Sequence, residues 1–130
     1  MRNLRRAAQV ANTSDFHVQV GAVAMCGTRI LSFGCNSAKS HPMQADFSQS
    51  RSAAYNTHAE IACLAPLRTR KDIDWSKVTL YVCRLRHDRP YGMARPCPAC
   101  MAAIQSLGIR HIVYTTNDGV ASENIFKKVS

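Results

Sequence analysis

Two strand-like runs on either side of a helix constrain the fold of this chain more than any other feature. Val78 to Leu85 and His111 to Thr115 are rich in β-branched and apolar residues, which is typical of buried strands. Between them, Pro96 to Leu107 predicts a helix, with proline near its first turn and Gly108 just past its end, where these residues are preferred. This order predicts an α/β layered domain with a largely buried sheet.

The remaining elements follow from periodicity and turn residues, and we expect helices at residues 3–12 and 58–70 and strands at residues 18–25 and 29–34. Pro66 should kink the second of these helices or end it early. The polar stretch from Asn36 to Thr57 predicts a long loop, and the last segment, ending in NIFKKVS, predicts a short helix. The sequence shows no repeat and no linker, so we expect a single domain over residues 1–130.

The chain is strongly basic. Seventeen Lys and Arg oppose eight Asp and Glu, which gives a formal charge of +9. Such an excess on a small domain favours an anionic partner, either a phosphorylated substrate or a nucleic acid. A charge that serves only solubility is the alternative interpretation.

Six cysteines in a short chain could indicate a secreted disulfide scaffold. The N-terminal arginines are followed by no apolar run, so a signal peptide is not predicted, and no stretch approaches the roughly 20 apolar residues of a membrane helix. Four of the cysteines stand singly in apolar patterns typical of core residues, namely Cys26, Cys35, Cys63 and Cys83. We therefore expect a reduced, cytoplasmic protein without a membrane partner.

Two short segments carry the residues that predict chemistry, His58-Ala59-Glu60 and Pro96-Cys97-Pro98-Ala99-Cys100. A catalytic zinc ion takes three protein ligands and keeps its fourth position open, whereas a structural zinc ion is closed by four ligands. His58, Cys97 and Cys100 supply three suitable ligands, and the two thiolates at a helix start can face one ion. The pattern predicts a catalytic Zn²⁺ site.

Glu60 stands two residues beyond His58, so its carboxylate can lie beside the open metal position without being a ligand. Zinc lowers the pKa of water towards neutrality. Glu60 can then take the proton of that water, pass it to a ring nitrogen and help to protonate a departing amino group. A redox Cys-x-x-Cys pair and a four-ligand structural site are the alternatives, but Cys63, the nearby fourth candidate, is placed for the core.

The combination of H-x-E with P-C-x-x-C matches the signature of zinc nucleobase deaminases. From Val20 to about Tyr114 the sequence resembles the cytidine and deoxycytidylate deaminase superfamily. The resemblance implies a three-layer α/β/α sandwich around a mixed, roughly five-stranded sheet. It also implies zinc on His58, Cys97 and Cys100, Glu60 as proton shuttle, and substrate contacts from the Asn36 side chain and the Ala59 backbone. For Asn36, a turn-capping role is the alternative.

The branch within the superfamily sets the expected substrate. Cys100 to Ile109 looks most like deoxycytidylate deaminases, whereas His58-Ala59-Glu60-Ile61 is similar to tRNA adenosine deaminases, in which Glu usually stands at the position of Arg95. We expect deamination of a cytosine nucleotide by a homo-oligomer. The alternatives are a deaminase acting on a base within RNA or single-stranded DNA, and a non-catalytic zinc-binding module. Lys39, Arg51 and Arg95 are candidates to bind a substrate phosphate.

Overall fold

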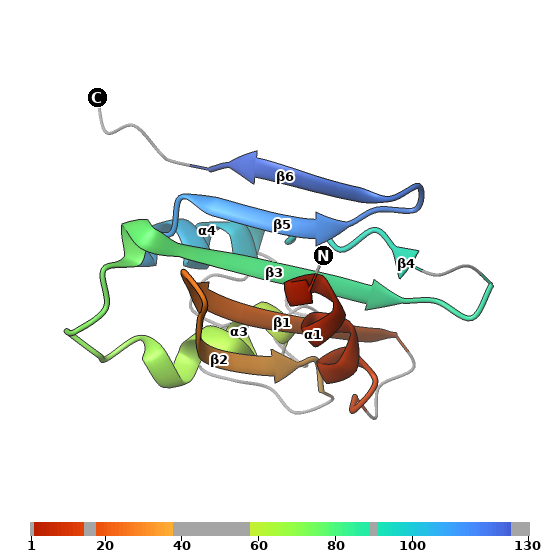
Figure 1. Ribbon diagram of the computed structural model, residues 1–130, viewed down its shortest axis with the longest axis horizontal. Coiled ribbons are helices and arrows are strands. Elements are labelled where there is room, and N and C mark those ends of the chain that lie inside the picture. Colours follow the sequence, from red (N-terminus) through yellow and green to blue (C-terminus); the bar gives the residue numbers. More distant parts are fainter. Residues whose placement is uncertain (1, 15–17, 38–57, 89–90, 126–130) are drawn as a thin grey trace.

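A mixed β-sheet forms the centre of the computed structural model, which describes residues 2–14, 18–37, 58–88 and 91–125 (Figure 1). Its main strand order is β2-β1-β3-β5-β6, and a short strand, β4, pairs with β3. Strands β3 and β5 run parallel, and the other pairs are antiparallel. The bounds are Gln19–Cys26 for β1, Arg29–Cys35 for β2, Val78–Leu85 for β3, Tyr91–Gly92 for β4, His111–Thr115 for β5 and Val120–Asn124 for β6.

Helices cover both faces of the sheet. Helix α1 (Arg2–Ala11) lies on one face, and α3 (Ala59–Leu64) and α4 (Pro98–Leu107) lie on the other (Figure 1). Two 3₁₀ turns, Ala65–Leu67 and Trp75–Lys77, complete the described helical elements. None of the helices in the described segments has the length and hydropathy needed to cross a bilayer. The predicted three-layer α/β/α fold with a mixed sheet is confirmed.

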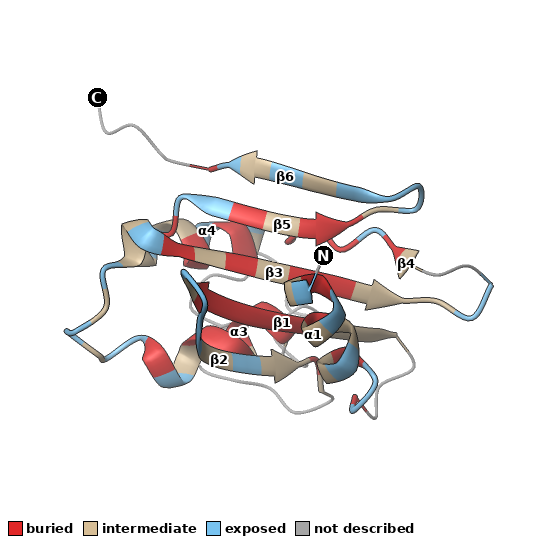
Figure 2. Ribbon diagram, in the orientation of Figure 1, coloured by how far each residue is buried: buried red, intermediate tan, exposed pale blue. Residues whose placement is uncertain are grey.

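Side chains of β3 alternate between the two layers because successive residues of a strand point to opposite faces. Leu80 and Val82 join the core beneath α3 and α4, whereas Cys83 packs with Ala7 of α1. Figure 2 shows that burial is concentrated in β1, β3 and β5, while β2 and β6 carry exposed positions. Arg84, two residues beyond Val82, therefore belongs to the face that carries α3 and α4.

The structure corrects three sequence-based expectations. The helix predicted at residues 58–70 ends as an α-helix at Leu64, because Pro66 lies in the following 3₁₀ turn and cannot donate a backbone hydrogen bond. Strands β4 and β6 were not predicted: β4 has two residues, and β6 is an edge strand with the weakly apolar sequence VASEN. The helix predicted for the last segment is not seen at Asn124, which ends β6, and residues 126–130 lie outside the described part, as does most of the loop predicted at 36–57.

Gly34 allows α3 to lie directly against β2. A Cβ atom added at Gly34 would lie 2.5 Å from the backbone nitrogen of Cys63 and 2.7 Å from the carbonyl carbon of Ala62. We therefore expect Gly34→Ala to lower the free energy of unfolding by about 1–3 kcal/mol, the usual cost of overpacking. Urea denaturation followed by circular dichroism would measure it. An unchanged unfolding midpoint would show that α3 is not held closely on the sheet.

Candidate active site

The first helical turns of α3 and α4 meet behind the sheet and carry the predicted metal-ligating residues. His58 is the N-cap of α3 and Cys97 is the N-cap of α4, both with extended backbone at φ −77°, ψ 155° and φ −66°, ψ 165°. Cys100 follows in the first turn of α4, where its backbone nitrogen donates to the Cys97 Sγ over 3.5 Å. Pro98 starts α4 and Gly108 caps it in the left-handed region at φ 99°, as the sequence predicted. The first turns of these two helices therefore hold the three predicted ligand residues in place.

The distances among these side chains suit a zinc ion. The Nδ1 atom of His58 lies 3.1 Å from the Cys100 Sγ and 3.6 Å from the Cys97 Sγ, and the three ligand atoms lie within 4.8 Å of one another. Tetrahedral zinc with its usual bond lengths places nitrogen and sulfur ligands about 3.6 Å apart. Among the described residues, this is the group of His, Cys, Asp and Glu that could hold a metal ion, and Cys63 is not part of it. Three ligands leave a fourth position open.

The pKa of one of the two thiols suits metal binding. A hydrogen bond from Cys100, helped by His58, lowers the pKa of Cys97 to about 4. The same hydrogen bond raises the pKa of Cys100 above its usual range. The hydrogen bond with Cys97 also raises the pKa of His58. Because the thiolate is the form that binds metal, Cys97 is prepared as a ligand.

Glu60 is buried beside this group without belonging to it. Its residue is only 5% exposed, and it lies in the first turn of α3, on the wall of the same pocket as His58 and Cys97. Burial raises the pKa of the Glu60 carboxyl group above its ordinary value. A raised pKa lies closer to neutral pH, and a side chain that accepts and donates protons works best when its pKa is near the working pH.

A pocket of about 310 Å³ opens next to the ligand group. Its wall combines apolar side chains with polar groups from β1, β3, the start of α3 and the segment before α4, including Val18, Val20, Asn36, Ala59, Arg84 and Arg95. This volume lies at the lower end of small-molecule sites. Five of the predicted site residues line the pocket, namely His58, Ala59, Glu60, Cys97 and Asn36. Cys100 belongs to the ligand group but not to the pocket wall.

Asn36 is held by several protein contacts. Its Oδ1 accepts from the Val20 backbone nitrogen at 3.0 Å and from the Ser14 hydroxyl at 2.7 Å, and its Nδ2 donates to the Val18 carbonyl. Asn36 is 8% exposed and still reaches the pocket wall. These contacts tie the end of β2 to the start of β1, so they give Asn36 a structural role at the site. Its contact with the substrate stays a prediction.

Comparison with known protein families shows which family the chain belongs to. A family model described as the cytidine and deoxycytidylate deaminase zinc-binding region matches residues 1–116. The chain belongs to this family. It is a zinc-dependent deaminase, and zinc is its cofactor.

Solved structures show the same fold as this deaminase. The dCMP deaminase of cyanophage S-TIM5 in apo form has 20% sequence identity and a TM-score of 0.61, covering 88% of this chain and 80% of that chain. The phage enzyme in complex with dCMP and dUMP has 19% identity and a TM-score of 0.60, over 87% and 77%. A cytidine deaminase from Burkholderia pseudomallei has 17% identity and a TM-score of 0.67, over 95% and 91%. Comparison with curated protein sequences found no match.

The basic residues at the pocket of this deaminase differ from those that the sequence suggested. Arg95 lines the pocket, but its Nε donates to the Glu123 Oε2 at 2.7 Å and its Nη2 to the Glu123 Oε1 at 3.2 Å. Lys39 and Arg51 lie outside the described residues. Arg84, at the end of β3, also lines the pocket, and the sequence had not singled it out for this role. The alternation of side chains along β3, which places Arg84 on the face covered by α3 and α4, is the sequence signal that could have found it.

Proposed function

We propose that this deaminase converts a cytosine nucleotide to its uracil form by hydrolysis, with release of ammonia, and that the substrate is a monomer such as dCMP. The observation that carries the proposal is the position of Glu60, which is buried on the wall of the pocket that His58 and Cys97 also line. A ligand group and a proton carrier facing one small cavity are what hydrolysis of an amino group requires. A non-catalytic zinc module would have no need of this carboxyl group.

In the proposed reaction, the residues divide the work. His58, Cys97 and Cys100 would hold zinc, which supplies a nucleophile when bound because it lowers the pKa of water. The Glu60 carboxylate accepts a proton from the attacking water and delivers it to the ring nitrogen of cytosine. It then accepts the second proton of the former water molecule from the hydroxyl group at C4 and passes it to the amino group, so that the C4–N bond breaks, ammonia leaves and the C4 carbonyl of the uracil form remains. Its burial keeps bulk water from competing for these protons.

The shape and polarity of the pocket support a monomeric substrate. A volume of about 310 Å³ suits one small molecule, and the Val18 and Val20 side chains offer an apolar wall for a planar base. Ala59 lines the pocket in the first turn of α3, and we expect its backbone to meet the polar edge of that base. The structure of the cyanophage dCMP deaminase contains dCMP and dUMP, which supports the same substrate class here.

An ammonia-release screen tests the proposed function. We expect dCMP to give the highest kcat/KM among deoxycytidine, dCMP, adenine nucleotides and short cytosine-containing DNA and RNA oligonucleotides. Turnover of a monomer should also depend weakly on salt, because few phosphate contacts are made, whereas a polymer would lose affinity steeply between 50 and 200 mM salt. Preferred turnover of an oligonucleotide with steep salt dependence would contradict the monomer assignment. Preference for an adenine nucleotide would contradict the choice of base.

A further inference from the structure

Arg84 stands where the sheet meets the active-site pocket. It is the penultimate residue of β3 and pairs across the sheet with Val20 of β1 and Gly92 of β4. Its side chain shares the face of Leu80 and Val82, which pack towards α3 and α4. Arg84 and Val20 both line the pocket that contains Glu60. Arg84 thus forms part of the wall of the proposed substrate site.

The Arg84 side chain is partly buried, and no described residue forms a hydrogen bond with its Nε. Within the described part of the chain, its Nε is the buried side-chain nitrogen or oxygen atom that has no hydrogen-bond partner. No ion pair joins Arg84 to a described acidic residue, whereas Arg86 pairs with Asp88 and Arg95 with Glu123. A buried donor without an acceptor costs free energy, and a charged donor costs more.

The fold holds Arg84 in place from its backbone side. The Arg84 backbone nitrogen donates to the Thr115 Oγ1 at 3.1 Å, and that hydroxyl donates to the Gly92 carbonyl at 2.8 Å. Thr115 is fully buried, so this bridge fixes β3, β4 and β5 together. A Cβ atom added at Gly92 would lie 3.0 Å from the Arg84 Cδ, so a larger residue at this position would crowd the Arg84 side chain. The backbone of Arg84 is therefore held firmly within the sheet.

We infer that Arg84 binds the phosphate group of a mononucleotide substrate and so makes this enzyme prefer the nucleotide over the nucleoside. The inference rests on the proposed function, because it assumes that the pocket takes a cytosine-containing monomer. An arginine fork matches the geometry of a phosphate and makes charge-assisted hydrogen bonds with it. Arg84 lines the pocket and, among the described residues, forms no ion pair that a phosphate would have to displace.

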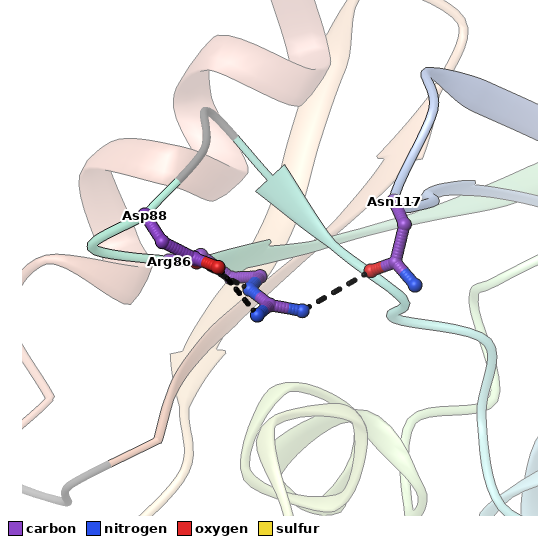
Figure 3. A network of polar contacts seen from close by, with 3 residues as sticks. All are labelled: Arg86, Asp88 and Asn117. Atoms are coloured by element: carbon purple, nitrogen blue, oxygen red, sulfur yellow. Dashed lines mark hydrogen bonds and ion pairs between the residues drawn. The ribbon is translucent and has the colours of Figure 1, made fainter.

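The neighbouring arginines are less suited to this role. Arg95 reaches the pocket, but both oxygens of the Glu123 carboxylate already bind it. Arg86 lies just beyond β3, where its Nε and Nη2 donate to Asp88 at 2.8 and 2.9 Å and its Nη1 reaches Asn117 at 3.5 Å (Figure 3). Arg86 does not line the active-site pocket. It therefore offers a control with the same charge, near the same strand end.

The test compares Arg84→Gln with Arg86→Gln in the zinc-loaded protein. Steady-state kinetics with dCMP and with deoxycytidine give the ratio of the two kcat/KM values, and calorimetry with dUMP and deoxyuridine gives the ratio of affinities. In Arg84→Gln both ratios should fall about 10- to 100-fold, the usual weight of a charge-assisted hydrogen bond. Arg86→Gln should leave both within about threefold. Arg84→Lys, which keeps the charge and most of the stem, should fall between Arg84→Gln and the parent.

The outcomes separate this inference from the proposed function. If the parent deaminates neither dCMP nor deoxycytidine, the proposed function fails. If the parent prefers dCMP and Arg84→Gln keeps that preference, only the role of Arg84 is overturned. An equal fall in Arg86→Gln would mean that the effect is one of general charge, which also overturns it. A fall seen with a cytosine-containing oligonucleotide but not with dCMP would assign Arg84 to a polymer backbone and overturn the monomer inference.

Discussion

Glu60→Gln should abolish deamination while leaving the fold and the zinc in place. Glutamine has the size of glutamate and keeps most of its hydrogen bonds, and Glu60 lies outside the ligand group. The variant cannot accept the proton of water or pass it to the ring nitrogen. General acid–base catalysis is worth about 10²–10⁴-fold, so a residue that serves several proton transfers should cost about 10⁴-fold or more in kcat. Ammonia release at saturating substrate would measure the loss.

Zinc analysis and thermal unfolding of the same preparation show whether Glu60→Gln acts on the chemistry alone. The matched control is Asp72→Asn, which also converts a carboxylate to an amide but lies exposed in an ion pair with Arg70. Asp72→Asn should keep kcat within about threefold of the parent. A Glu60→Gln enzyme that turns over substrate within about tenfold of the parent would rule out an obligatory proton relay.

Cys97→Ala should lose zinc, and with it both activity and stability. The change removes the thiol that a hydrogen bond from Cys100 and the nearby His58 keep at a pKa of about 4, which makes it the prepared ligand. We expect zinc content to fall from about one ion per chain to a small fraction. If the parent is studied at about 100 times its Kd for zinc, the lost linkage lowers the free energy of unfolding by about 2.7 kcal/mol. Metal analysis after gel filtration and denaturant unfolding would measure both.

Cys63→Ala is the control, because it makes the same substitution in the core. Cys63 is fully buried and donates to the Ser32 carbonyl at 3.5 Å, and burial raises its pKa to about 12. This variant should keep its zinc and lose about 1 kcal/mol of stability, as for an ordinary small core change. If Cys97→Ala kept full zinc, or if Cys63→Ala lost it, the assignment of the ligands would be wrong.

Much of the candidate site could be predicted because its residues stand in two short segments of the sequence. His58-Ala59-Glu60 and Pro96 to Cys100 each place their groups within one helical turn, so residue type and spacing alone indicate a metal and a proton carrier. The structure places their ligand atoms within 4.8 Å of one another, and the family match supports the interpretation. The start of α4 and its glycine end were predictable for the same reason, since both depend on neighbouring residues.

The tertiary structure decided which polar groups of the pocket are already engaged. Arg95 was predicted as a phosphate ligand from its position beside Cys97, but Glu123 binds it from β6, a strand whose sequence is too polar to be predicted. Arg84 was not among the predicted phosphate ligands, yet it lines the pocket, and no described residue accepts a hydrogen bond from its Nε. Whether a charge is compensated depends on partners distant in the sequence, and packing of the sheet alone brings those partners together. The sequence by itself therefore determined the candidate metal ligands and the candidate proton carrier, because they stand within single helical turns. The fold determined which arginine of the pocket wall is already paired, because its partner Glu123 comes from a distant strand.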